Sequence, residues 1–126
     1  MSELTRYGIL GCGMMGQEHI RNLNLLSGAS VAAIYEPDPK MRNKAHLLAP
    51  DAQLSDDLPD LLKSKIDALV ISTPNYLHCE QLLEVLDFCR IPVADFLNYS
   101  NLKTYLRSIQ ATFYYRKKTI KILKNL

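Results

Sequence analysis

Three glycines near the N-terminus have a spacing that suits phosphate binding. They directly follow the short apolar run Tyr7–Leu10 and precede a helical pattern. In a strand–turn–helix unit the first glycine makes the tight turn, the second lets backbone approach a pyrophosphate, and the third lets the helix pack closely on the strand. The free N–H groups at the start of such a helix hold phosphate groups. The predicted dinucleotide contacts of this turn are Gly11, Gly13, Met14, Met15 and Gly16.

A carboxylate further along the chain strengthens this prediction. Glu36 ends the next apolar segment, Ser30–Tyr35, and lies 20 residues after Gly16. In a dinucleotide-binding fold, an acid at this position accepts hydrogen bonds from the adenosine ribose hydroxyls. Its charge repels a 2′-phosphate at close range, which favours NAD, while Lys40 and Arg42 nearby leave NADP as an alternative. The competing interpretation is a glycine turn in an α/β domain that binds no nucleotide.

Strand-like and helix-like segments alternate through most of the chain. Short apolar runs predict strands at 7–10, 30–35, 53–54, 68–72 and 91–93. Helical spacing of apolar residues predicts helices at about 14–26, 40–48, 58–62 and 76–88. This alternation predicts an α/β protein with a doubly wound, Rossmann-like parallel sheet. We expect the sheet to be incomplete, because the alternation stops near residue 93.

The charge balance changes at the same place. Residues 1–93 carry eight Lys/Arg and twelve Asp/Glu, whereas residues 94–126 carry seven Lys/Arg and one acid. We therefore divide the chain into a dinucleotide-binding domain, 1–93, and a divergent basic tail, 94–126. Apolar positions at helical spacing predict a helix over about 101–124 in that tail.

Residues 5–93 resemble the amino-terminal domain of the glucose–fructose oxidoreductase, inositol dehydrogenase and rhizopine-catabolism (Gfo/Idh/MocA) family. The resemblance rests on Tyr7–Gly16, Ala33–Pro39 and, above all, Ala68–His78, which ends in Thr-Pro-Asn-x-x-His. It implies an NAD(P)-dependent oxidoreductase acting on CH–OH groups of sugars and polyols. It also implies that a second group of residues lines the cofactor cleft towards the nicotinamide ribose. These residues are Ser72, Thr73, Pro74, Asn75 and His78. From the residues alone, a structural place at its helix start is the favoured interpretation of His78.

The chain departs from this family after Val93. Family members continue into a Glu-Lys-Pro motif with a catalytic lysine and then a second, substrate-binding domain, and neither pattern occurs in this sequence. Dehydrogenation needs a general base near the substrate hydroxyl, so we identify no catalytic residue. We expect a domain that binds the cofactor but is truncated and inactive alone. A frameshift or splice product would explain the tail.

Other partners and the compartment follow from composition. Three cysteines form no Cys-x-x-Cys pair and leave an odd count, which favours the cytoplasm. We expect no metal, for want of ligand spacing, and no membrane partner, since no apolar run approaches about 20 residues. A non-catalytic dinucleotide-binding or protein-interaction module is the alternative function. Nucleic-acid binding by the basic tail is less favoured, and an exposed sheet edge suggests self-association.

Overall fold

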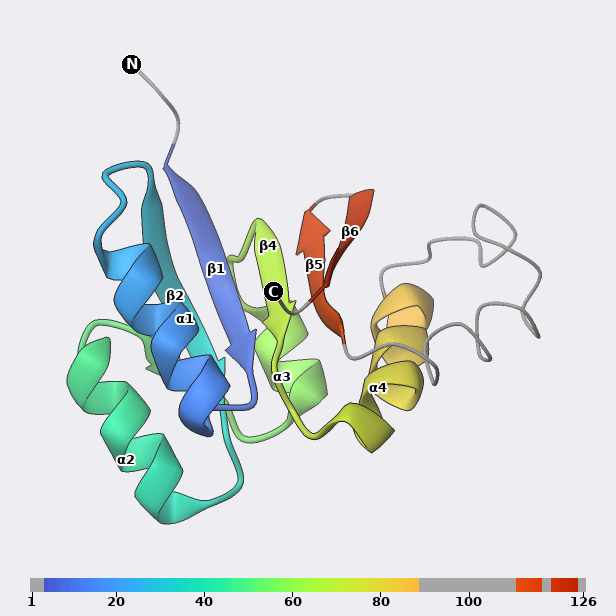
Figure 1. The fold of residues 1–126 in the computed structure, drawn as a ribbon, viewed down its shortest axis with the longest axis horizontal. Coiled ribbons are helices and arrows are strands. Elements are labelled where there is room, and N and C mark those ends of the chain that lie inside the picture. Colours follow the sequence, from blue (N-terminus) through green and yellow to red (C-terminus); the bar gives the residue numbers. More distant parts are fainter. Residues whose placement is uncertain (1–3, 89–110, 117–118, 125–126) are drawn as a thin grey trace.

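The described chain, residues 4–88, 111–116 and 119–124 of this computed structural model, forms one six-stranded sheet (Figure 1). Its strand order is β3-β2-β1-β4-β5-β6. Four strands are parallel: β1 Thr5–Leu10, β2 Ala29–Tyr35, β3 Gln53–Leu54 and β4 Ala68–Ile71. Two are antiparallel: β5 Ala111–Arg116 and β6 Thr119–Lys124. The order of the parallel strands is that of one half of a doubly wound sheet, so the predicted fold class is confirmed.

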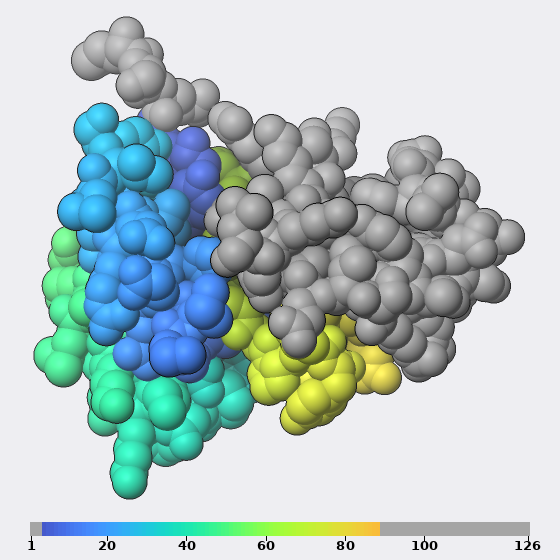
Figure 2. Space-filling model, in the orientation of Figure 1, coloured from blue at the N-terminus to red at the C-terminus, as the bar shows by residue number. Residues whose placement is uncertain are grey.

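Helices follow the parallel strands and cover both faces of the sheet. They are α1 Met14–Asn24, α2 Pro39–Leu48, α3 Leu58–Lys63 and α4 Asn75–Phe88. Helices α1 and α2 lie side by side over one face (Figures 1 and 2), whereas the core residues of α3 and α4 belong to the other. None of the helices in the described ranges has the length and apolar character that crossing a membrane would require.

The strand sequences explain this two-sided packing. Successive side chains of a strand point to opposite faces. Thus Ile9 packs in the core beneath α1 and α2, whereas its neighbour Leu10 packs in the core beneath α3 and α4. Strand β4 alternates in the same way, with Val70 on the first side and Leu69 and Ile71 on the second. Because both faces are buried there, β4 and the end of β1 are continuously apolar.

The predicted helix over 101–124 is wrong in the described part of that segment. Residues 111–116 form β5, which pairs with β4 from Ile71 opposite Phe113 to Ala68 opposite Arg116, and β6 pairs with β5. Threonine, phenylalanine and tyrosine favour strands, and the free edge of β4 supplies unpaired backbone groups on which a strand can form. The β4 edge is therefore covered by the tail. The strand predicted at 91–93 lies outside the described residues.

Candidate dinucleotide-binding site

Two of the three motif glycines, Gly11 before α1 and Gly16 in its first turn, are required for steric reasons. Gly11 has a φ of +90°, and a Cβ there would lie 2.7 Å from the backbone nitrogen of Thr73. A Cβ on Gly16 would lie 2.1 Å from the carbonyl oxygen of Gly11. At Gly13, by contrast, no heavy atom lies within 4 Å of the position that a Cβ would take. Gly11 and Gly16 let the turn pack, whereas Gly13 leaves open space in front of the backbone.

Hydrogen bonds with β2, with the loop after β4 and with α1 hold the backbone of Gly11 and Cys12 in place. The Gly11 N–H donates to the carbonyl oxygen of Tyr35 at 3.0 Å, and the Ser72 hydroxyl donates to the Gly11 carbonyl oxygen at 2.7 Å. The buried Gln17 side chain donates to the Cys12 carbonyl oxygen at 2.9 Å. The backbone of Gly11 and Cys12 is thus bound within the protein.

The start of α1 is left without a side-chain cap. Gly13 is the N-cap residue, and no side chain accepts a hydrogen bond from the first turn. The N–H groups of Met14 and Met15 have no acceptor within the helix, because the first turn of any α-helix lacks one. At α2 and α3, in contrast, Asp38 and Asp57 accept backbone N–H groups at 2.9 and 2.7 Å. The N–H donors and positive dipole end of α1 are therefore available to an anion.

A cavity of about 610 Å³ opens in front of this helix start, at the carboxyl ends of β1, β2 and β4. Eight of the eleven residues predicted to bind the cofactor line it: Gly11, Gly13, Met14, Met15, Glu36, Ser72, Thr73 and Pro74. Of the other three, Gly16 lies beneath the turn against Gly11, the exposed Asn75 begins α4, and His78 is buried. The spacing of the two motifs thus converges on one cleft.

Glu36 joins the end of β2 to the glycine turn. Its Oε2 accepts the backbone N–H of Cys12 at 2.6 Å, and its Oε1 accepts the N–H of Asp38 at 3.1 Å. The side chain is half-buried and lines the cavity. A carboxylate has about four lone-pair sites, so two backbone N–H bonds leave capacity for hydroxyl donors of a ligand.

His78 supports the wall of the cavity from behind. Its side chain, in a residue only 3% exposed, lies within hydrogen-bond distance of the Thr73 carbonyl oxygen through Nε2. Since a carbonyl can only accept, Nε2 carries the hydrogen. The Thr73 hydroxyl in turn donates to Oε1 of Gln81. His78 thus fixes Thr73 and does not line the cavity.

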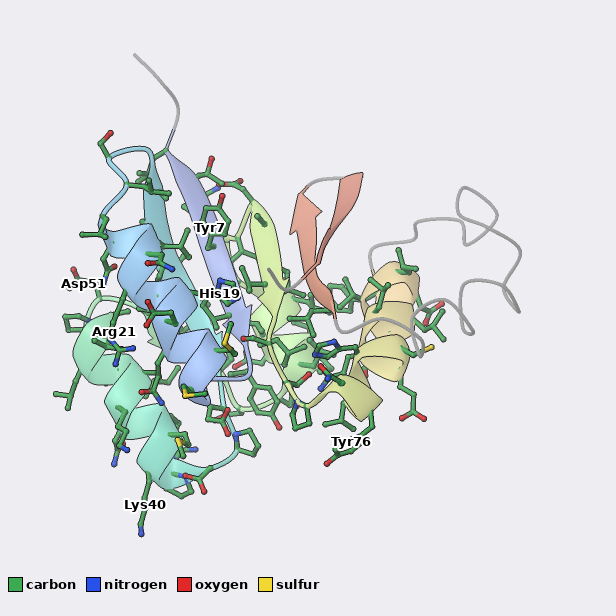
Figure 3. The ribbon with its side chains drawn as sticks, in the orientation of Figure 1. Tyr7, His19, Arg21, Lys40, Asp51 and Tyr76 are labelled. Carbon is green, nitrogen blue, oxygen red and sulfur yellow. The ribbon has the colours of Figure 1, made fainter. Side chains whose placement is uncertain are left out.

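The cavity is also lined by six residues that the sequence motifs did not indicate. They are Leu10, Tyr35, Pro37, Tyr76, Leu77 and Gln81. Five of them adjoin a predicted residue in the sequence, so proximity to the motifs was the available signal. Tyr76, labelled near the start of α4 in Figure 3, is 79% exposed, and Gln81 lies one helical turn beyond His78.

Cys12, in the glycine turn, has a thiol of low reactivity. Burial, together with the negative charge of Glu36, raises the pKa of the Cys12 thiol to about 12. At neutral pH this thiol stays protonated and is a poor nucleophile or metal ligand. No group of three or more His, Cys, Asp or Glu side chains that could hold a metal ion occurs within the described ranges.

These features define a class of protein. A glycine turn after a central parallel strand, an uncapped helix start and an acid at the end of the neighbouring strand, all on one cavity, characterise a dinucleotide-binding domain of the Rossmann type. Residues 5–88 match the family model of the Gfo/Idh/MocA oxidoreductases for their NAD-binding Rossmann fold. The chain belongs to this family.

Relatives include enzymes of known activity. Inositol 2-dehydrogenase of Corynebacterium glutamicum is 36% identical over 89 residues, covering 69% of this chain and 26% of the relative. The myo-inositol dehydrogenase structure from Lactobacillus casei, in complex with NAD(H) and myo-inositol, superposes with a TM-score of 0.62 at 31% identity, covering 67% and 26%. The WlbA dehydrogenase of Bordetella pertussis, in complex with NADH and UDP-GlcNAcA, gives 0.63 at 30% identity, covering 68% and 26%. The chain spans about a quarter of the length of these relatives.

Proposed function

We propose that this chain binds NAD(H) in the cavity in front of α1, as the nucleotide-binding part of an oxidoreductase acting on sugars or polyols. One observation carries the proposal: the uncapped start of α1, the open position at Gly13 and the Glu36 carboxylate all lie on the same cavity. A dinucleotide needs these three things, namely phosphate donors, room for the phosphates and an acceptor for ribose hydroxyls.

Each predicted residue then has a place in the complex. The N–H groups of Gly13, Met14 and Met15 hold the pyrophosphate, and Gly11 and Gly16 shape the turn that presents them. Glu36 accepts from the adenosine ribose hydroxyls. On the other side of the turn, Ser72, Thr73 and Pro74 form the cavity wall at the end of β4, which faces the nicotinamide nucleoside. Asn75, which begins α4 next to this wall, contacts the same part of the cofactor. His78 acts through Thr73 as a positioning residue, an assignment supported by its bond to the Thr73 carbonyl.

NAD is the preferred cofactor in this proposal. The Glu36 carboxylate repels a 2′-phosphate placed where it accepts the ribose hydroxyls. A second cavity of about 500 Å³ shares Tyr35 and Pro37 with the first and is lined by Arg42. The Arg42 guanidinium would attract a 2′-phosphate. NADP therefore still binds, but more weakly than NAD because of the Glu36 carboxylate.

Turnover of a substrate needs more than this site. Bound NAD supplies the hydride acceptor, and oxidation of an alcohol also requires a general base at its hydroxyl. No lysine or histidine is among the described residues that line the cavity. We therefore propose that the chain alone binds NAD(H) without oxidising polyols such as inositol, the substrate class of the relatives.

A non-catalytic dinucleotide-binding module is the second candidate. It is favoured by the same absence of lysine and histidine from the described cavity lining and by the pairing of β5 with β4, which ties the tail to the sheet. In this case residues 94–126 contribute an interaction surface, and deleting them abolishes binding of a protein partner. The domain division at residue 93, self-association through the outer edge of the sheet and a cytoplasmic location remain part of the proposal.

Titration of the whole chain with NADH tests the proposed function. The nicotinamide fluorescence of NADH should change saturably as the protein is added. A parallel assay with NAD and myo-inositol should give no NADH. Fluorescence that stays flat with a folded sample would refute binding, and NADH production would refute the lack of turnover.

A further inference from the structure

The amide side chain of Gln81 is half-buried in the wall of the cavity. It lies in α4, three residues after His78, so both side chains project from the same side of the helix. The neighbouring helix positions Leu82 and Val85 are buried in the core, whereas Gln81 is half-buried and lines the cavity. A partly buried amide is costly unless its donors and acceptor find partners.

Its acceptor is used to hold the cavity wall. The Thr73 hydroxyl donates to Oε1 of Gln81, and the Thr73 carbonyl oxygen accepts from Nε2 of His78. Two side chains of α4 thus hold Thr73, one through its hydroxyl and the other through its carbonyl oxygen. Thr73 also packs on the glycine turn, because its methyl carbon lies 2.7 Å from where a Gly11 Cβ would be. This places the Gln81 carboxamide at a fixed point beside the turn.

The amide nitrogen of Gln81 is then the group left for a ligand. A carboxamide has two N–H donors besides its oxygen, and the planar group keeps the nitrogen beside the oxygen that Thr73 engages. The described contacts give this nitrogen no hydrogen bond within the protein. Since the side chain lines the cavity, these donors suit an oxygen atom of a bound molecule.

The position along the cavity identifies which part of the molecule that is. Glu36, at the end of β2, marks the adenosine side, and the start of α1 marks the phosphates. Gln81 lies beyond the end of β4, on the opposite side of the turn from Glu36. Resting on the proposed function, we infer that Gln81 is a cofactor-binding residue whose carboxamide N–H groups donate to an oxygen of the nicotinamide nucleoside.

Two variants separate the donor from the acceptor. Gln81→Glu keeps an oxygen for the Thr73 hydroxyl but replaces the N–H donors, and Gln81→Met removes both functions without adding charge. NADH and ADP are the probes, since ADP has the adenosine and phosphates but lacks the nicotinamide nucleoside. Gln53→Glu is the matched control, because this exposed glutamine of β3 does not line the cavity and receives the same charge.

Isothermal titration of the whole chain gives the decisive comparison. Loss of one hydrogen bond should weaken NADH binding by about three- to tenfold in both Gln81 variants, while ADP binding changes less than about twofold. Gln53→Glu should leave the ratio of the two affinities as in the wild type. Unchanged NADH binding, or an equal loss for NADH and ADP, overturns the inference. A wild-type chain that binds neither probe instead refutes the proposed function itself.

Discussion

Glu36 and Cys12 connect the ends of two neighbouring strands, because the Glu36 Oε2 accepts the Cys12 backbone N–H at 2.6 Å. The acid that is proposed to bind ribose therefore also holds the glycine turn that is proposed to bind phosphate. The second oxygen of the same carboxylate accepts the N–H of Asp38, the residue that caps α2. A change at Glu36 should thus alter both cofactor selectivity and the order of the turn.

Replacing the charge of Glu36 tests its role in cofactor choice. Glu36→Gln retains an oxygen for the Cys12 N–H but loses the negative charge and one acceptor. NADH binding should weaken about three- to tenfold, and the preference for NADH over NADPH should fall about tenfold, because repulsion of the 2′-phosphate is removed. Titrations with both nucleotides measure this. Glu84→Gln, the same change on an exposed residue of α4, should leave the preference intact; an equal shift in both variants would contradict the assignment.

Gly13 and Gly28 form a matched pair for testing the phosphate site. Neither has a heavy atom within 4 Å of the position of a Cβ, but Gly13 alone lines the cavity. Gly13→Ala should alter the free energy of unfolding by no more than about 1 kcal/mol yet weaken NADH binding more than about tenfold, since the methyl group occupies space needed by the phosphates. Gly28→Ala should change neither affinity. If Gly13→Ala binds NADH normally, the phosphates do not lie there.

Arg6 and Asp67 join the starts of β1 and β4 away from the site. The Asp67 carboxylate accepts the Arg6 backbone N–H at 2.9 Å and pairs with its guanidinium at 3.1 Å. Asp67→Ala should lower the free energy of unfolding by about 1–2 kcal/mol, because a backbone donor loses its acceptor while the half-exposed ion pair is screened. Urea unfolding measures this. Glu18→Ala breaks an exposed pair with Arg21 and should cost under about 0.5 kcal/mol; equal losses would contradict the account.

His19 should make the fold sensitive to acid. Burial lowers its pKa, an effect that the negative charge of Glu18 partly offsets, and its Nε2 is buried without a partner in the described chain. Figure 3 shows His19 between α1 and the sheet. The imidazole of His19 takes up a proton less readily in the folded state than in the unfolded chain. The contribution of neutral His19 to stability is therefore complete above about pH 6.5 and is lost as the pH falls below that value. Urea midpoints between pH 7.5 and 5 should fall less steeply in His19→Met than in the wild type. Identical slopes would rule out this role.

Much of the site follows from local spacing. The glycines, Glu36 and the segment from Ser72 to Pro74 each come directly after a strand, and the carboxyl ends of parallel strands meet at one edge of a sheet. Their types and positions therefore suffice to place them near one another, and eight predicted residues line one cavity.

The remaining features depend on contacts between distant segments. The direction of the His78 side chain is set by how α4 packs on the loop after β4, which its motif does not encode. Gln81 carries no motif at all. The tail has apolar positions that suit a helix, but the β4 edge gives it strand partners more than 40 residues away in the sequence. Non-local pairing of this kind overrides helical spacing.

Isothermal titration of the whole chain with NADH and with NADPH tests the central claim most directly. The account predicts saturable binding of NADH at one molecule per chain, with weaker binding of NADPH because of the Glu36 carboxylate. No saturable heat with a folded sample, or NADPH binding more tightly than NADH, would contradict it.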